Sequence, residues 1–335
     1  MKRNKIKTKF ISPLIDKNQS IKLVKKILNN EIPNEGILTK KFEKEISRLL
    51  NVKYTVVTTS GTIAIFLALR ALNISKNDEV LVPNITFAAT PNAVSLTGAK
   101  PVLVDINEET LLLDIKKLKK KINKKTKAVI AVHISGRGSN IIQLKKLCAK
   151  YKLKLIEDAA EAFMSKFNNK PLGTFGEMGC FSFSPPKIFT TGQGGAVVTN
   201  NYKLYKEIIK LKNQGRVGKT DGGEDTYESI GYNFKFTNLQ RALGLTQLKN
   251  INWRKKKLID NYNFYKSNIK QNLNFKIFKF DLKNGELPLW TDVYCKERNK
   301  LHNYLQKNGI ECRYFWHPIN YCKPYKKSFD GLQNL

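Results

Sequence analysis

The sequence predicts an α/β protein built on a mostly parallel sheet, because strand and helix signals alternate through its first two-thirds. The chain has 335 residues, of which 41% are hydrophobic and 10% aromatic, so it can bury a large core. Short apolar runs rich in valine and isoleucine mark the strands. We expect strands at 54–59, 79–84, 101–106, 128–134, 154–159, 178–184 and 196–199.

Helix-length segments separate several of these strands, at 89–98, 114–122 and 141–151. The pattern changes near Phe236. From there to Ile269, apolar residues recur at spacings of three and four, which predicts a long helical stretch. We interpret this stretch as a connector. The expected division is a large α/β domain with an N-terminal arm, residues 1–245, and a smaller C-terminal α+β domain with the connector, residues 246–335.

One lysine stands between two of the expected strands. Lys187 follows the strand that ends at Ser184 and precedes a glycine-rich turn at 192–195, and Asp158 lies 29 residues earlier at the end of another strand. Parallel sheets place their chemistry at the carboxyl ends of strands. A lysine amine and a strand-end carboxylate suit pyridoxal phosphate (PLP). The amine condenses with its aldehyde, and the carboxylate keeps its ring nitrogen protonated.

A turn at residues 60–62 offers the phosphate site that this cofactor also needs. Ser60, Gly61 and Thr62 join a strand to an apolar helix, where backbone N–H groups and the helix dipole favour an anion. Each feature has an ordinary alternative. Ser60 could be a plain N-cap, Asp158 could cap the turn after it, and Lys187 could be one more solvated charge. The combination favours the cofactor.

Seven sequence blocks strengthen this interpretation, in order from about Pro33 to about Tyr325. They are SGTIAIFLAL, NITFAAT, PVLVDINEETLLLD, IEDAAEA, FSFSPPK, TTGQGGAVVTN and GYNFKFTNLQRALGLTQL. Together they resemble the DegT–StrS family of PLP-dependent sugar aminotransferases. The resemblance implies a fold-type-I aminotransferase with a seven-stranded, mostly parallel sheet, acting on nucleotide-activated keto-sugars.

The resemblance also implies roles for individual residues. Lys187 would be the lysine that binds the cofactor, and Asp158 the partner of its pyridine nitrogen. Gly61 and Thr62 match the phosphate turn, and Ser182 stands where the family has a phosphate-binding serine. These assignments place the groups that bind the pyridine ring and the groups that bind the phosphate at the ends of strands.

Three further residues follow from the same resemblance. Phe87 matches the aromatic that stacks on the cofactor ring, and Asn233 matches an asparagine that reaches the cofactor phosphate of the neighbouring subunit. Glu161 stands where many members carry glutamine or histidine near the phenolic oxygen of the cofactor. The loop at 133–140 departs from the usual family pattern, which points to a shifted substrate preference.

The implied reaction moves an amino group from L-glutamate to a nucleotide-linked sugar, expected to be a 4-keto-6-deoxy sugar. Such products serve amino-sugar and surface-polysaccharide biosynthesis, including lipopolysaccharide O-antigen. The family further implies a homodimer with shared active sites. Because family members usually continue beyond the position of Leu335, we expect a small domain that is minimal or incomplete.

The formal net charge of +33 raises the possibility of nucleic-acid binding. The lysines, however, are spread along expected helices without interleaved aromatics or a DNA-reading motif, so we expect no specific nucleic-acid partner. No apolar segment reaches the roughly 18–20 residues of a membrane span. Five unpaired cysteines fit a reducing cytoplasm, and no histidine–cysteine cluster predicts a metal. Another fold-type-I PLP enzyme, or an inactive or regulatory homologue, remains an alternative.

Overall fold

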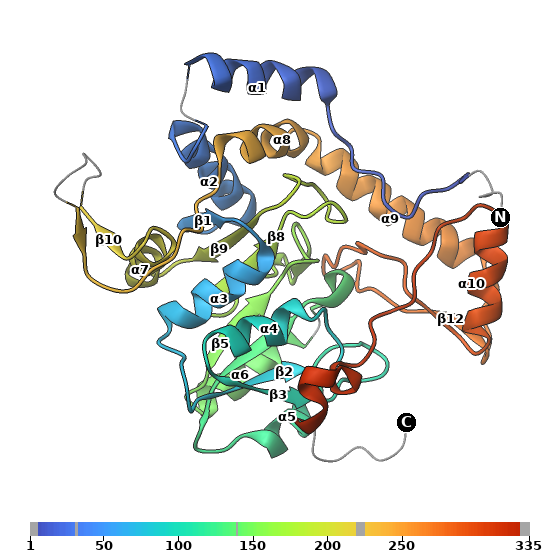
Figure 1. Cartoon of the computed structure of the whole chain (residues 1–335). Coiled ribbons are helices and arrows are strands. Elements are labelled where there is room, and N and C mark those ends of the chain that lie inside the picture. The colour runs from blue at the N-terminus through green and yellow to red at the C-terminus, as the bar shows by residue number, and fades with distance from the viewer. Residues whose placement is uncertain (1–5, 31–32, 139, 219–224, 329–335) are drawn as a thin grey trace.

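A computed structural model of the chain describes residues 6–30, 33–138, 140–218 and 225–328 (Figure 1). Its centre is a seven-stranded sheet with the order β1-β9-β8-β5-β4-β2-β3. Strand β9 is antiparallel to both of its neighbours, and the other neighbouring pairs are parallel. The strands are β1 (Tyr54–Thr58), β2 (Glu79–Pro83), β3 (Lys100–Val104), β4 (Thr126–Val132), β5 (Lys154–Asp158), β8 (Met178–Ser182) and β9 (Gly195–Thr199).

Helices cover both faces of the sheet, because the central strands are apolar on both faces. Val57 and Leu81 point to one apolar cluster, whereas their neighbours Val56 and Val80 point to the other. The first cluster includes residues of α2 (Ile37–Leu50), α5 (Ile115–Lys121), α6 (Ile141–Lys150) and α8 (Asn238–Leu248). The second includes residues of α3 (Gly61–Ala71), α4 (Ala89–Leu96) and α7 (Tyr202–Lys212). Helix α1 (Lys17–Asn30) packs on α8 outside the first layer (Figure 1).

The C-terminal part forms a smaller region beside the sheet. It contains α9 (Ile251–Asn268), β12 (Phe275–Ile277), β13 (Val293–Cys295) and α10 (Arg298–Lys307), with β12 and β13 paired antiparallel. Tyr262, Ile277 and Phe280 form a separate buried cluster there. Short elements complete the chain: β6 (Lys166–Phe167), β7 (Lys170–Pro171), β10 (Arg216–Val217), β11 (Thr226–Tyr227), and 3₁₀ turns at Ile134–Gly136, Ile319–Tyr321 and Lys323–Ser328.

The predicted α/β architecture is confirmed. All seven expected strands form, and the helices expected at 89–98, 114–122 and 141–151 correspond to α4, α5 and α6. The helical stretch expected from Phe236 consists of two helices, since α8 ends at Leu248 and α9 begins at Ile251. The domain boundary predicted between residues 245 and 246 falls inside α8 and stays a prediction. Within the described ranges, we find no helix with the length and apolar character needed to cross a bilayer.

A charged group lies beneath the sheet edge, between α2, β1 and α7. The backbone N–H of Val57 donates to Glu43 Oε1 at 2.9 Å, and Lys212 Nζ lies 3.9 Å from the same oxygen. Lys212 also contacts Glu35 Oε1 at 2.5 Å. Burial raises the pKa of Glu43 to about 7, although the charge of Lys212 and the Val57 hydrogen bond act in the opposite direction. Glu43 therefore keeps its proton in the folded protein over a pH range in which the unfolded chain releases it.

This arrangement predicts that stability falls as pH rises. Between the ordinary glutamate pKa of 4.5 and about 7, the folded state binds more protons than the unfolded state, so the free energy of unfolding decreases with pH. In Glu43→Gln this contribution is absent. We expect the difference in unfolding free energy, wild type minus variant, to drop by about 3 kcal/mol from pH 4.5 to pH 8.

Urea unfolding of the two proteins at several pH values measures this difference. Glu45→Gln is the matched control on the same helix. The pKa of Glu45 is lowered, chiefly by its hydrogen bond from Arg48, so the wild-type-minus-Glu45→Gln difference in unfolding free energy should stay nearly constant above pH 5. A constant wild-type-minus-Glu43→Gln difference across this range would contradict the assignment.

Candidate active site

The carboxyl ends of six strands lie at one edge of the sheet, including β3, which runs parallel to β2. The parallel directions of β2, β4, β5 and β8 bring their ends together, and β1 joins them because it is separated from β8 by one antiparallel strand. The residues that the sequence singles out follow these ends. Asp158 closes β5, Ser182 closes β8, Gly61 follows β1, and Phe87 follows β2. The edge therefore gathers groups that are far apart in the chain.

Asp158 is a buried carboxylate at this edge, only 6% exposed. The hydroxyl of Thr90, on α4, donates to its Oδ2 at 2.7 Å, and the backbone N–H of Ala160 donates to Oδ1 at 3.2 Å. Burial raises the pKa of Asp158, whereas these two hydrogen bonds and the charge of Lys187 favour its ionised form. Asp158 thus does more than cap the turn after β5, because a buried carboxylate of this kind is suited to bind a cationic partner.

Lys187 lies in the loop between β8 and β9, and its side chain is 14% exposed. The loop is held at its base, where the backbone N–H of Phe183 donates to Gly194 O at 2.8 Å. Gln247 of α8 binds the backbone of the same loop at Thr190. Its side chain accepts from the backbone N–H of Thr190 at 3.1 Å and donates to the backbone oxygen of Thr190 at 2.7 Å. The lysine is therefore presented by a fixed loop.

The turn after β1 has the shape expected of a phosphate cradle. The Ser60 hydroxyl caps α3 by accepting from Ile63 N at 3.2 Å. Gly61 and Thr62 begin the helix, where backbone N–H groups have no intrahelical acceptor. A Cβ on Gly61 would lie 2.8 Å from the Cβ of Ser182. The turn and the end of β8 thus approach each other more closely than a side chain at position 61 would permit.

Glu161 connects Lys187 to two other segments. Its Oε1 lies 3.3 Å from Lys187 Nζ and accepts a hydrogen bond from Trp290 Nε1 at 3.2 Å. Its Oε2 accepts from the backbone N–H of Ser135 at 2.9 Å. A small cavity of about 10 Å³ beside Lys187 and Glu161 is closed by the apolar side chains of Leu287 and Leu289. The carboxylate therefore faces the lysine in a largely apolar setting.

Phe87 and Asn233, the two remaining residues that the sequence singled out, are both exposed. Phe87 is 59% exposed, and its ring centroid is 5.4 Å from that of Trp316. Asn233 is also exposed, on a segment fixed beside β1 by a hydrogen bond from Thr58 Oγ1 to Phe234 O at 3.1 Å. Both side chains are accessible to a bound molecule or a second subunit. The role of each stays a prediction.

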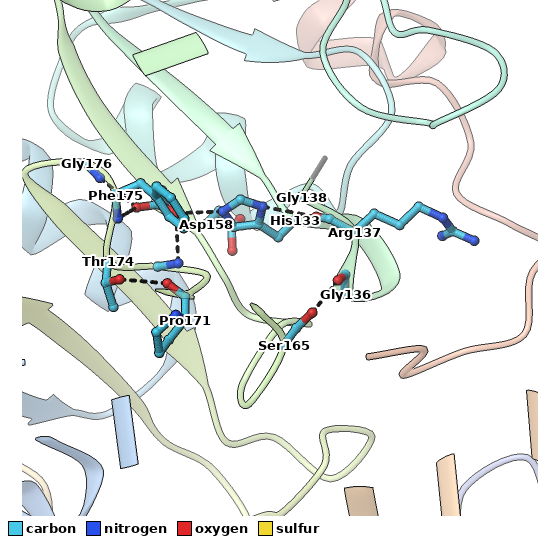
Figure 2. Close-up of polar contacts among 12 residues, drawn as sticks. His133, Gly136, Arg137, Gly138, Asp158, Ser165, Pro171, Thr174, Phe175 and Gly176 are labelled. Carbon is cyan, nitrogen blue, oxygen red and sulfur yellow. Dashed lines mark hydrogen bonds and ion pairs between the residues drawn. The ribbon is translucent and has the colours of Figure 1, made fainter. Parts of the chain in front are cut away.

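A buried polar network supports the loop that follows β4 (Figure 2). His133 Nε2 lies 2.8 Å from Glu157 Oε2, and His133 Nδ1 lies 3.0 Å from Arg137 O. Glu157 also accepts from the backbone N–H groups of Gly173, Phe175 and Gly176. In Figure 2 the Arg137 side chain points away from His133, and it pairs with Asp292 at 2.6 Å. This loop carries Ser135, so the network holds the loop that contacts Glu161.

Several side chains of the site were not singled out in the sequence. Thr90 lies within the NITFAAT block, three residues after Phe87 and in the first turn of α4. This spacing is the signal in the sequence that could have identified it. Trp290 contacts the site from the C-terminal part of the chain, outside all seven sequence blocks, whereas Gln247 lies within the GYNFKFTNLQRALGLTQL block, in which only Asn233 was singled out. Long-range packing alone brings them to the site.

The residues present fit PLP. The chain supplies an amine at Lys187, a buried carboxylate at Asp158 and a glycine-opened helix start at Gly61, which matches the donor set that the cofactor requires. In the part of the chain that the structure describes, no group of three or more histidine, cysteine, aspartate or glutamate side chains could hold a metal ion.

Comparison with known proteins agrees with this geometry. Residues 14–334 match the DegT/DnrJ/EryC1/StrS aminotransferase family. The chain belongs to this family. A GDP-perosamine synthase from Vibrio cholerae is 36% identical over 321 residues, which are 94% of this chain and 86% of that relative. The resemblance stated from the sequence blocks is therefore confirmed.

Solved structures extend the match to the fold. Helicobacter pylori PseC, an aminotransferase involved in the biosynthesis of pseudoaminic acid, superimposes with a TM-score of 0.89 at 29% identity over 99% of this chain and 90% of that one. The PLP form of Spr1654 from Streptococcus pneumoniae gives 0.87 at 26% identity over 95% and 87%. The fold is that of the fold-type-I aminotransferases, as the sequence predicts.

Proposed function

We propose that this aminotransferase uses PLP to transfer the amino group of L-glutamate to a nucleotide-linked keto-sugar, with a 4-keto-6-deoxy sugar as the expected acceptor. Glutamate leaves as 2-oxoglutarate, and the sugar carbonyl becomes an amine. One observation carries the cofactor assignment. The buried Asp158 closes β5, and Lys187 lies in the loop that follows β8, the parallel strand paired with β5. The names of the relatives, a GDP-sugar synthase and a pseudoaminic acid enzyme, support the sugar class.

Lys187 and Asp158 would have different roles in the reaction. When bound, PLP supplies an aldehyde carbon and a ring that accepts electrons from a carbon losing its proton. Lys187 Nζ would hold the cofactor and, once released, take a proton from the donor carbon and return it. Asp158 would keep the ring nitrogen protonated, which stabilises the charge that develops on the ring. Both groups lie at the ends of neighbouring strands, β8 and β5.

The remaining predicted residues would bind the rest of the cofactor. Gly61, Thr62 and Ser182 would contact the phosphate, because the helix start and the end of β8 meet there. Phe87 would stack on the ring from the open side. Glu161 would lie near the phenolic oxygen, since it already contacts Lys187. We expect the enzyme to act in the cytoplasm.

Amino transfer to a panel of nucleotide-linked keto-sugars, with glutamate as donor, tests the proposal. The wild type should form an amino sugar from at least one member, detected by mass spectrometry, together with an equal amount of 2-oxoglutarate. Lys187→Ala should form none, because a lost general base alone removes about 10² to 10⁴ in rate and the cofactor link is lost as well.

Other outcomes would support the alternatives. A wild type that binds PLP but acts only on amino acids would indicate a different fold-type-I enzyme. A wild type that binds PLP and turns over neither sugars nor amino acids would indicate an inactive or regulatory homologue. In both cases the sugar proposal would be wrong.

We also propose that the enzyme is a homodimer in which Asn233 completes the active site of the partner subunit. The exposed Asn233 side chain and its fixed backbone, held beside β1 by Thr58, support this role. Coexpressed Lys187→Ala and Asn233→Ala chains should regain part of the activity. A mixed dimer would contain one site with both defects and one site with neither.

The measurement is the specific activity of heterodimers purified with two different tags. The control is each tagged single variant mixed with itself, which should stay near zero for Lys187→Ala. If Asn233 acts within its own subunit, mixed dimers should show no rescue beyond the single variants, and the shared site would be contradicted.

A further inference from the structure

An N-terminal arm, residues 7–12, is attached to the C-terminal part of the chain. The backbone N–H groups of Lys7 and Thr8 donate to Gly309 O at 2.8 and 3.1 Å, and Glu311 N donates to Thr8 O at 2.9 Å. In Figure 1 the blue segment before α1 runs past α9 toward α10. The arm is therefore tied to the polypeptide that follows α10, some 300 residues away in sequence.

Phe10 is a half-buried residue of the arm, as is its neighbour Ile11. Its ring stacks on the indole of Trp290, with centroids 4.8 Å apart and planes 11° from parallel. Its backbone N–H donates to Glu311 Oε2 at 3.0 Å, and the guanidinium of Arg313 lies 5.0 Å from the ring centroid. The ring is thus held by one aromatic face and one cation, and the Glu311 carboxylate holds the backbone of Phe10.

Trp290 carries this contact into the active site. Its Nε1 donates to Glu161 Oε1 at 3.2 Å, and the same oxygen lies 3.3 Å from Lys187 Nζ. Indole N–H and lysine ammonium groups are donors only, so the Glu161 carboxylate accepts from both. A continuous chain of contacts therefore runs from Phe10 through Trp290 and Glu161 to Lys187.

We propose that Phe10 is a positioning residue for the reaction, which fixes the Trp290 indole so that its N–H holds the Glu161 carboxylate beside Lys187. The inference rests on the proposed function, in which Lys187 carries PLP. A tryptophan side chain has two torsions, and stacking against Phe10 restricts both of them. A carboxylate held next to a cationic nitrogen favours the protonated form of that nitrogen.

The test follows the visible absorbance of the PLP-loaded enzyme as a function of pH. Phe10→Ala removes the stack, and Trp290→Phe keeps an aromatic ring but removes the N–H donor. Each should move the midpoint of the absorbance change to lower pH by about half a unit or more, because Glu161 is less well held beside the nitrogen. Phe10→Tyr should restore the wild-type midpoint, and Lys9→Ala, an exposed neighbour in the arm, is the matched control.

A double-mutant cycle shows whether Phe10 acts through the indole. In the Trp290→Phe background, Phe10→Ala should add little further shift, because the donor that it positions is already absent. Tryptophan fluorescence monitors the contact between Phe10 and Trp290 in protein that has no bound cofactor. In a Trp253→Phe, Trp316→Phe background, Trp290 is the remaining tryptophan, and Phe10→Ala should change its emission in the cofactor-free protein.

Two results would overturn the positioning role alone. The first is that the PLP-loaded wild type, Phe10→Ala and Trp290→Phe all have the same midpoint pH of the absorbance change. The second is that the midpoint shifts of the two single variants simply add in the double variant. A wild type without any visible band after incubation with PLP would overturn the proposed function, and the positioning role with it. Trp290→Phe provides the readout if Phe10→Ala loses its fold.

Discussion

The arrangement of the active site depends on one buried carboxylate, Asp158. Burial raises its pKa, so the ionised form persists only if donors surround it. Thr90 and Ala160 supply two hydrogen bonds, and the charge of Lys187 also favours the ionised form. In the proposed function, a protonated pyridine nitrogen would be a further cationic partner. Helix α4, the loop after β5 and the loop bearing Lys187 thus all contribute groups that act on this one carboxylate.

The sheet geometry makes this convergence possible. Parallel strands bring their carboxyl ends to the same edge, so residues separated by more than a hundred positions become neighbours without long connections. The antiparallel β9 returns the chain after the Lys187 loop and packs Gly195 against the turn that precedes α3. The lysine loop and the phosphate turn are thereby supported by the same strand. The C-terminal region then closes the site from the side, with Leu287, Leu289 and Trp290.

The strands and the groups at their ends could be predicted from the sequence, because buried parallel strands are apolar runs and their last residues carry the chemistry. Lys187, Asp158 and Gly61 were identified in this way, and the structure brings them to one edge. Trp290 and Phe10 could not be identified, since their contacts depend on the packing of distant segments. The break between α8 and α9 was also missed, because the apolar spacing continues through Lys249 and Asn250.

The central claim is that Lys187 is the cofactor-bearing residue, and chemical trapping tests it most directly. Borohydride reduction of the PLP-loaded enzyme fixes the cofactor on the amine that holds it, and peptide mapping locates the label. Lys187 is one of 60 lysine and arginine residues, so nonspecific reaction would distribute the label over many peptides. We predict a single pyridoxyl group on the peptide containing Lys187. A stoichiometric label on any other lysine would contradict the account.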